Sequence, residues 1–345
     1  MIRLALVWSV LVGMGTAPET PNTQRFEVTG VEMAVPIRIV LYAPDADSAN
    51  RAAQAALAEF ARLNLVFSDY DARSEARRLC KQAKIDQPTR VSGDLFLVLA
   101  ASKELHHQSG GAFDVTAGPL TKLWRRTLRR GELPTDARLA EARARVGFDL
   151  VRLDPAKKTV ALLRQSMQLD FGGIAKGYAL DKSLEVLNKH GITRALIDAS
   201  GDIRVGDPPP GRDAWRIGIA RLDDDGPPMH FLAIRNAAVA NSGDSWQYVE
   251  IDGRRYSHLI DPRSGMALTD HAGVTVIAPD AMLADGLASA VSVLGPTDGI
   301  KLVESHPDAA VLIVRSPDGK PEVHRSSRLD RFLEEPNPER EGVGE

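Results

Sequence analysis

Alternating apolar and polar positions divide the first third of the chain into strand-like and helical segments. An apolar run rich in β-branched residues predicts a strand over 32–42. Helical spacing predicts a helix over 48–65 with Asp47 as its cap. A second helix is predicted over 94–109, with Asp94 as N-cap and two glycines after its end.

The middle of the chain adds short strands and a third helix. Strand-like segments at 151–153 and 159–163 precede a helix that follows Asp170–Gly173 and ends at Gly191. Between 194 and 278, short strands alternate with Gly, Pro and Asp turns. This pattern is typical of an antiparallel or mixed sheet.

A last helix, strongly apolar, is predicted over 280–294. The chain has no internal repeat, and no linker divides residues 25–325. These elements therefore predict an α+β fold, a single two-lobed unit of mixed or antiparallel sheets and packed helices.

Composition excludes several function classes. The 345 residues include 43 Lys and Arg against 46 Asp and Glu, a formal net charge of -3. With so small a net charge, the protein as a whole does not attract nucleic acid or an anionic membrane surface. Cys80 is the only cysteine, so neither an intramolecular disulfide nor a cysteine-based zinc site is available.

Both ends of the chain differ from the part between them. Residues 1–17 combine Arg3, a short apolar run and small residues, which predicts a signal peptide and an exported, periplasmic or otherwise extracytoplasmic protein. A buried N-terminal strand or helix is the alternative. Residues 326–345 grow polar and charged, so we expect the last part of this tail to be disordered.

A lysine at a glycine-rich helix entrance suggests an anion site. Gly172 and Gly173 precede the predicted helix, and Lys176 lies in its first turn. Helix N-termini favour anions and disfavour lysine. A phosphate or carboxylate at this entrance would explain Lys176, and ordinary helix-entry chemistry is the alternative.

The last predicted helix carries two isolated oxygen ligands. Asp285 and Ser289 lie at i and i+4 on one face of an otherwise apolar helix. A buried carboxylate is costly unless it is paired or metal-bound, and oxygen ligands suit Mg²⁺. The alternative is that Asp285 caps a loop or pairs with an arginine.

His258 ends a predicted strand just before an Asp-Pro-x-x-Gly turn, a position suited to a general base. A single histidine in such a place can equally be structural. The chain contains no HExxH, GxSxG, Walker A or GxGxxG motif to support protease, esterase, P-loop or Rossmann interpretations.

Taken together, these stretches resemble the FAD:protein FMN transferase (ApbE) family. The resemblance runs in the family's order from about residue 32 to about residue 295 and is specific because it is collinear. The matching segments are Tyr70–Glu75, Gly110–Thr116, Asp170–Gly177, Ser242–Asp244, His258–Gly265 and Ala284–Ser289.

The resemblance implies three groups of site residues. Those that would line the FAD site are Met33, Tyr70, Ala112, Phe113, Asp114, Asp170, Lys176 and Ile260. Those that would hold Mg²⁺ are Gly173, through its carbonyl, Asp285 and Ser289. His258 would be the catalytic base. The chain departs from the family at Ala34 and Val35, where a Gly-Thr pair is usual, and at Ala288, where some members have a second acid.

The implied activity is Mg²⁺-dependent transfer of the FMN part of FAD to a Thr or Ser hydroxyl of another protein, with release of AMP. The implied acceptor is an exported or membrane-attached electron-transfer protein with a short Thr/Ser flavinylation motif, so any membrane contact would be indirect. Hydrolysis of FAD to FMN and AMP, or binding of FAD without catalysis, are the alternatives. The arginines that follow Trp124 (Arg125, Arg126, Arg129 and Arg130) suggest a solvated helix face more readily than a docking site for an acidic partner.

Overall fold

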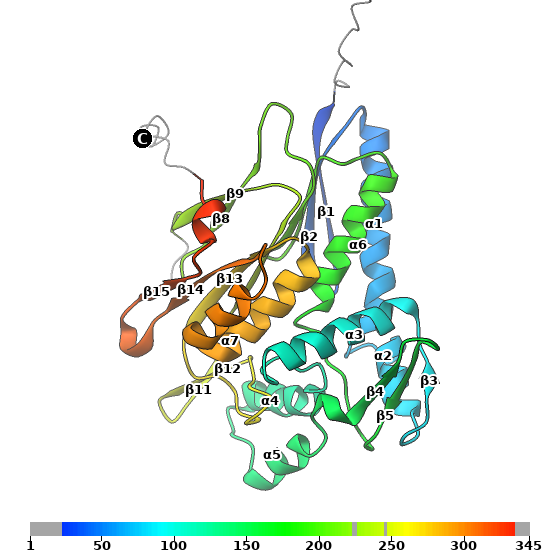
Figure 1. Ribbon diagram of the computed structural model, residues 1–345, viewed down its shortest axis with the longest axis vertical. Coiled ribbons are helices and arrows are strands. Elements are labelled where there is room, and N and C mark those ends of the chain that lie inside the picture. Colours follow the sequence, from blue (N-terminus) through cyan, green and yellow to red (C-terminus); the bar gives the residue numbers. More distant parts are fainter. Residues whose placement is uncertain (1–22, 223–225, 245–246, 335–345) are drawn as a thin grey trace, which may run out of the picture.

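An eight-stranded antiparallel sheet forms the centre of the molecule in the computed structural model, which describes residues 23–222, 226–244 and 247–334 (Figure 1). In sheet order, its strands are β1 (Gln24–Glu32), β2 (Val35–Ala43), β6 (Ala195–Ala199), β7 (Asp202–Val205), β10 (Ala238–Gly243), β13 (Ala272–Ala278), β14 (Ala310–Arg315) and β15 (Glu322–Arg325).

Three smaller sheets and a set of helices surround it. The smaller sheets consist of β3 (Thr89–Arg90), β5 (Thr159–Leu162) and β4 (Val151–Asp154); β8 (Trp215–Ile219) and β9 (His230–Ile234); and β11 (Tyr248–Ile251) and β12 (Arg254–Ser257). The α-helices are α1 (Ala46–Phe67), α2 (Glu75–Gln82), α3 (Gly93–Gln108), α4 (Gly118–Arg130), α5 (Asp136–Arg143), α6 (Ala175–Lys189) and α7 (Ala281–Glu304). Short 3-10 turns lie at Phe148–Leu150, Pro317–Gly319 and Leu329–Arg331.

The two faces of the central sheet are covered by different elements, and the pattern of β2 shows why. Ile37, Ile39 and Leu41 alternate along the strand and face the core beneath the helices. Val40 points the other way, into a second cluster with Trp215 of β8. Helices α1, α6 and α7 therefore cover one face, and the β8–β9 hairpin covers the other. The α+β fold is confirmed.

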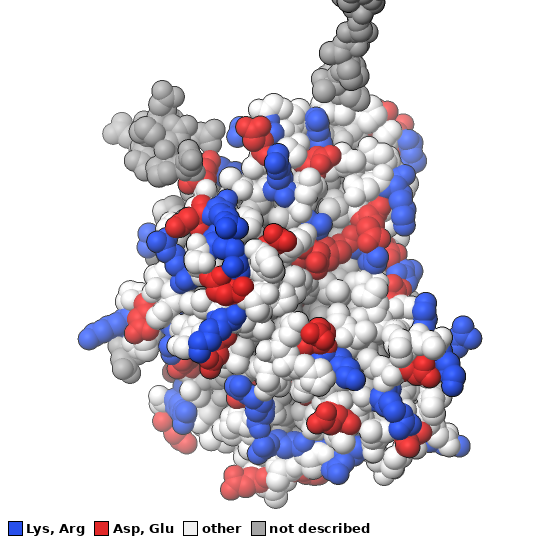
Figure 2. Space-filling model, viewed as in Figure 1, with Lys and Arg blue, Asp and Glu red and all other residues white. Residues whose placement is uncertain are grey.

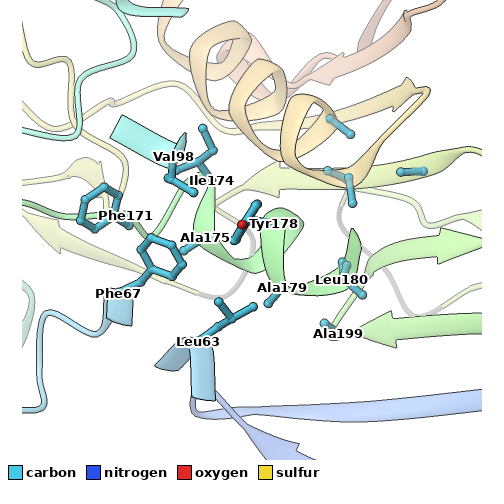
Figure 3. Close-up of a cluster of buried hydrophobic side chains, with 14 of the residues drawn as sticks. Leu63, Phe67, Val98, Phe171, Ile174, Ala175, Tyr178, Ala179, Leu180 and Ala199 are labelled. Atoms are coloured by element: carbon cyan, nitrogen blue, oxygen red, sulfur yellow. The ribbon is translucent and has the colours of Figure 1, made fainter. Parts of the chain in front are cut away.

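Helix α6 lies at the middle of the larger core. Figure 3 shows Phe171 and Tyr178 near Phe67 of α1, with Val98 of α3 alongside. The Phe67 ring meets both Phe171 and Tyr178 edge to face, with centroids 5.4 and 5.8 Å apart. The start of α6, where the glycine-rich segment ends, is thus held by aromatic packing.

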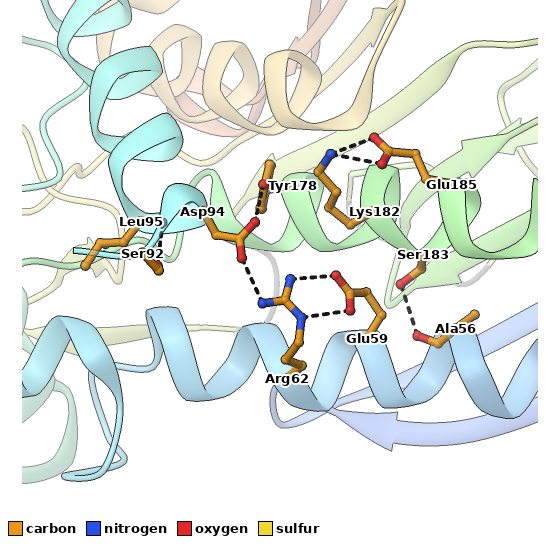
Figure 4. A network of polar contacts seen from close by, with 10 residues as sticks. All are labelled: Ala56, Glu59, Arg62, Ser92, Asp94, Leu95, Tyr178, Lys182, Ser183 and Glu185. Atoms are coloured by element: carbon orange, nitrogen blue, oxygen red, sulfur yellow. Dashed lines mark hydrogen bonds and ion pairs between the residues drawn. The ribbon is translucent and has the colours of Figure 1, made fainter. Parts of the chain in front are cut away.

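A polar network ties α1, α3 and α6 together at the edge of that core (Figure 4). Asp94 accepts the Tyr178 hydroxyl at 2.6 Å and pairs with Arg62 at 2.8 Å. The prediction that Asp94 caps its helix is therefore wrong: Ser92 is the N-cap and accepts from Leu95 N. The Asp94 side chain lies in the first turn of α3 and connects this helix with α1 through Arg62 and with α6 through Tyr178.

Two further local predictions are also corrected. Helix α1 is capped by Asp45, whose carboxylate accepts from Ser48 N, and Asp47 lies in its first turn. The strand predicted over 32–42 is interrupted by a two-residue hairpin turn, because Met33 and Ala34 have φ angles of 50° and 62°.

The folded part of the chain extends further toward the C-terminus than the sequence predicts. Residues 326–334 belong to the fold, contrary to the tail expected from 326: Leu329 is buried and Phe332 accepts from Ala233 N at 2.8 Å. This segment lies along β9, which explains its order despite its polarity. The predicted signal peptide, 1–17, and residues 335–345 lie outside the described residues. Among the described helices, none has the length and apolarity needed to cross a bilayer.

The molecular surface agrees with the nearly neutral composition. On the face in Figure 2, Lys and Arg side chains alternate with Asp and Glu, without a broad region of a single sign. Electrostatic recognition on this face is therefore local.

The contact between α6 and α7 depends on a glycine. A Cβ added to Gly177 would lie closer to the Ala281 carbonyl than real Cβ atoms come, with the Met282 Cα at 2.8 Å. We expect Gly177→Ala to lower the free energy of unfolding by about 1–3 kcal/mol, because the two helices must separate. Urea unfolding measures this loss.

The matched control is Gly93→Ala, at the start of α3. The nearest atom to an added Cβ there is the Lys158 Nζ at 3.9 Å. Its stability should stay within about 0.5 kcal/mol of the parent. Equal stabilities for the two variants would contradict the close α6–α7 contact.

Candidate functional site

A cavity of about 390 Å³ opens between the start of α6, helices α4 and α7, and the loop after β12. It brings together residues that the sequence places far apart. The predicted site residues that line it are Tyr70, Ala112, Phe113, Asp114, Asp170, Gly173, Lys176, His258, Ile260, Asp285 and Ser289.

Met33 is not among the residues that line this cavity. It lies at the β1–β2 turn and packs, partly buried, against the main core. Its predicted place in an FAD site stays a prediction.

Two carboxylates and one ammonium lie close together beside the cavity: Lys176 and Asp285 line it, and Asp202 contacts Lys176 without lining it. The Lys176 Nζ lies 2.7 Å from Oδ2 of Asp202, an oxygen that has no hydrogen bond in good geometry, so the contact is an ion pair. Asp285 accepts Gly177 N at 3.0 Å. Both carboxylates are buried, with exposed fractions of 2% for Asp202 and 6% for Asp285.

The charges of this group influence one another. Burial raises the pKa of Asp285 well above its ordinary range, and the neighbouring Asp202 raises it further. Burial of Lys176 opposes its charge, but Asp202 and Asp285 outweigh burial and raise the pKa of Lys176. With both acids ionised the group carries one uncompensated negative charge, which a cation would neutralise.

The predicted oxygen ligands lie close to each other. A Cβ added to Gly173 would collide with the Ser289 hydroxyl and come within 3.0 Å of the Ser289 Cβ. Asp285 lies one turn before Ser289 on α7, and all three residues line the cavity. The described residues contain no group of three His, Cys, Asp or Glu side chains that could hold a metal. A metal here would instead take one carboxylate, one hydroxyl and one carbonyl, a hard oxygen set.

His258 lines the cavity and has a defined tautomer. Its Nδ1 is 3.2 Å from the Gln247 carbonyl oxygen, and its backbone N–H donates to the same oxygen at 2.9 Å. Because a carbonyl oxygen only accepts, Nδ1 carries the proton in the neutral ring. The lone pair of Nε2 is then available to take a proton.

Burial lowers the pKa of His258, and the nearby cations Arg125 and Lys176 lower it further. The Gln247 carbonyl and Asp244 act in the opposite direction without reversing the shift. The neutral ring, the form that can act as a base, therefore persists below the ordinary pKa of 6.5.

Arg125 is a site residue that the sequence interpretation missed. Its guanidinium forms an ion pair with Asp69, lies 3.6 Å from Asp170, and stacks 4.3 Å from the Tyr70 ring centroid. The expected solvated helix face is therefore wrong for Arg125. The helical spacing could have predicted this position for Arg125. Thr121, Arg125 and Leu128 lie on one face of α4, and all three line the cavity.

Asp114 is held by its own neighbours. Its Oδ1 accepts the backbone N–H and the hydroxyl of Thr116 at 2.7 and 2.6 Å, and its Oδ2 lies 3.3 Å from the His106 Nδ1. The hydrogen bond with Asp114 raises the pKa of His106. This carboxylate shapes the cavity wall.

Two other acids near His258 are already engaged. Asp244 accepts from Arg255 Nε at 2.6 Å and from His271 Nδ1 at 2.7 Å. Asp261 accepts from Arg263 N and Arg263 Nε, each at 2.9 Å. Neither is therefore placed as a free base.

These features define a class of protein: an α+β enzyme whose cavity joins a cation-favouring oxygen set, a buried lysine and a neutral histidine. The ApbE family model matches residues 33–313. A relative from Haemophilus influenzae named FAD:protein FMN transferase is 33% identical over 264 residues, covering 74% of this chain and 76% of its own length.

Solved structures agree with that match. The flavin transferase ApbE from Vibrio cholerae superposes with a TM-score of 0.81 and 28% identity, over 90% of this chain and 100% of the other. The ApbE protein of Thermotoga maritima also gives a TM-score of 0.81, with 30% identity and the same coverage. The chain belongs to the ApbE family and is a transferase.

Asp244 offers a test of this local architecture. We expect Asp244→Asn to lower the free energy of unfolding by roughly 3 kcal/mol, because Arg255 and His271 lose a buried anionic partner. Thermal or urea unfolding provides the measurement. Asp213→Asn, at an exposed position, is the control and should be neutral. A fully stable Asp244→Asn protein would show that the buried pairs do not hold this loop.

Proposed function

We propose that this chain transfers the FMN part of FAD to a Thr or Ser hydroxyl of an acceptor protein and releases AMP. The observation that carries the proposal is the neutral His258, with Nε2 available, in one cavity with Lys176 and the oxygen set of Asp285, Ser289 and Gly173. Relatives named FAD:protein FMN transferase support the choice of substrate.

The chain's own groups account for the movement of atoms. The acceptor hydroxyl oxygen bonds to the FMN-side phosphorus of FAD, the bond from that phosphorus to the bridging oxygen breaks, and AMP leaves with that oxygen. The hydroxyl proton passes to Nε2 of His258. Lys176, at the start of α6, attracts the phosphates, and Arg125 stacks on Tyr70 at the outer wall.

Mg²⁺ fits the oxygen set, because Asp285, Ser289 and the Gly173 carbonyl are hard donors next to an uncompensated negative charge. When bound there, Mg²⁺ would neutralise charge on the pyrophosphate oxygens. The acceptor would be an exported or membrane-attached electron-transfer protein, in keeping with the predicted signal peptide.

A single assay tests the proposal. The protein is incubated with FAD, Mg²⁺ and a Thr-containing acceptor, and products are followed by flavin fluorescence on denaturing gels and by AMP release. We expect covalent flavin on the acceptor together with AMP. Release of AMP without labelling would show a hydrolase, and intact bound FAD would show a binding protein.

The metal site predicts the behaviour of Asp285→Asn. The amide keeps an oxygen that accepts from Gly177 N but loses the charge, so we expect transfer to fall by about 10²-fold or more. Mg²⁺ should raise the melting temperature of the parent and not of the variant. Equal Mg²⁺ effects on both proteins would remove Asp285 from the metal site.

The tautomer of His258 predicts the behaviour of His258→Asn. The variant should bind FAD normally and transfer roughly 10²–10⁴-fold more slowly, because the acceptor hydroxyl loses its base. In the parent, the lowered pKa keeps the base form as pH falls through 6.5, so kcat/KM should decline only at lower pH. That decline should be missing in the variant. An unchanged pH profile would show that His258 is structural.

A further inference from the structure

A groove lined by basic side chains leads away from the cavity along α4. A hollow of about 240 Å³ shares Tyr70 and Arg125 with the cavity of the candidate site. A further hollow of about 390 Å³ shares Lys122, Arg129 and Gln168 with the first hollow. The two hollows, which we call the basic groove, therefore continue from the wall of the site to the contact between α4 and α5, two helices that lie side by side (Figure 1).

The charge that lines the basic groove is mostly positive and mostly unpaired. The acids that line it already have partners: Asp69 pairs with Arg125, and Glu141 pairs with Arg145 at 3.3 Å. The other charged residues of the lining are all cations, and their side chains form no ion pair or hydrogen bond with any residue that the structure describes: Arg77, Lys122, Arg126, Arg129 and Arg138. The groove thus carries positive charge that the described part of the fold does not neutralise.

Helix stability does not explain where these cations lie. Lys122 and Arg126 are at i and i+4 on α4, and Arg126 and Arg129 are at i and i+3, so like charges are neighbours on the helix surface. The helix dipole favours Arg129 in the last turn but not Lys122 or Arg126. Arg77 and Arg138 add positive charge from α2 and α5. Cations from three helices that line one groove favour a binding surface for an anion over a solvated helix face.

The shape and position of the groove favour a protein segment as that anion. Pro119, Leu123 and Ala142 line the hollow between α4 and α5 together with the cations. An extended acidic chain can enter such a hollow and contact both apolar and basic side chains, whereas a flat membrane surface meets only its rim. The groove also ends at Tyr70 and Arg125, which line the cavity where an acceptor must present its hydroxyl.

We propose that the basic groove binds an acidic segment of the acceptor protein and directs the adjoining Thr or Ser into the cavity of the candidate site. The inference rests on the proposed transfer activity. Carboxylates of the segment would pair with Arg126 and Arg138 at the far end of the groove, and with Lys122 and Arg129 nearer the site. Because these cations have no partner in the described part of the chain, docking breaks no existing pair, and the attraction also speeds encounter.

The first test measures binding apart from catalysis and uses two fluorescein-labelled peptides as probes. One carries a stretch of Asp and Glu before a single threonine, and the other carries Asn and Gln at the acidic positions. We expect fluorescence anisotropy to show binding of the acidic peptide only, with an affinity that falls as ionic strength rises. Equal binding of the two peptides would overturn the acidic specificity. Binding to anionic phospholipid vesicles but not to the acidic peptide would overturn the protein partner.

Charge reversal tests the location. Arg126 and Arg138 line the basic groove but not the cavity of the candidate site, so the double variant Arg126→Glu/Arg138→Glu leaves that cavity unchanged. We expect the Kd for the acidic peptide to rise by roughly tenfold or more, with the affinity for FAD at its parental value. The matched control, Lys103→Glu/Lys189→Glu, makes the same change in net charge at exposed helical positions outside the groove. Its Kd should stay within about twofold of the parent. Equal Kd values for the parent and the groove variant would overturn the location.

Transfer of FMN separates a failure of this inference from a failure of the proposed function. Two pools of peptides carry the acidic stretch or its Asn/Gln counterpart, each followed by randomised residues around one threonine. With FAD, Mg²⁺ and limiting peptide, the parent should label the acidic pool roughly tenfold faster or more, and the groove variant should lose only that advantage. Equal labelling of both pools by the parent would overturn the groove while the transferase activity stands. Acidic peptide that binds, but is not labelled in either pool while AMP is released, would instead overturn the transferase activity.

Discussion

A buried cluster of two carboxylates and one ammonium governs the site, and its crowding raises the pKa of Asp285. Asp202 comes from β7, Lys176 from α6 and Asp285 from α7, so three elements each deliver one member. None can move away alone, because an unpaired charge in the interior is far costlier than a paired one. In the proposed function, the same cluster would attract a cation and, through the cation and Lys176, phosphate.

Close helix packing brings these charges together. Gly177 lets α6 approach the Ala281 carbonyl of α7, and its own N–H donates to Asp285 at 3.0 Å. One turn earlier, Gly173 lies against Ser289 with no room for a side chain. The glycine-rich segment therefore acts as a surface without side chains against which α7 packs, with Ser289 next to Gly173 and Ala281 next to Gly177.

Sequence patterns predicted what depends on local chemistry and missed what depends on distant partners. The start of α7 and the motif residues that gather in the cavity followed from spacing and from family resemblance. The cap of α3 was misplaced, since Ser92 and Asp94 are both good caps and only Arg62 and Tyr178 decide between them. Arg125 was missed because its acidic partners lie in other segments. The turn at Met33 was hidden because neither turn residue is a glycine.

The position of the acceptor bears on the choice between transfer and hydrolysis. Water reaches any open phosphorus, so a transferase must give its acceptor an advantage over water. Binding of the acceptor in a fixed orientation supplies one, because a correctly oriented group can act at an effective concentration of ~10⁵ M or more. In the proposed reaction the base is the same for either nucleophile, so the positioning of the acceptor, more than the base, determines whether transfer or hydrolysis occurs.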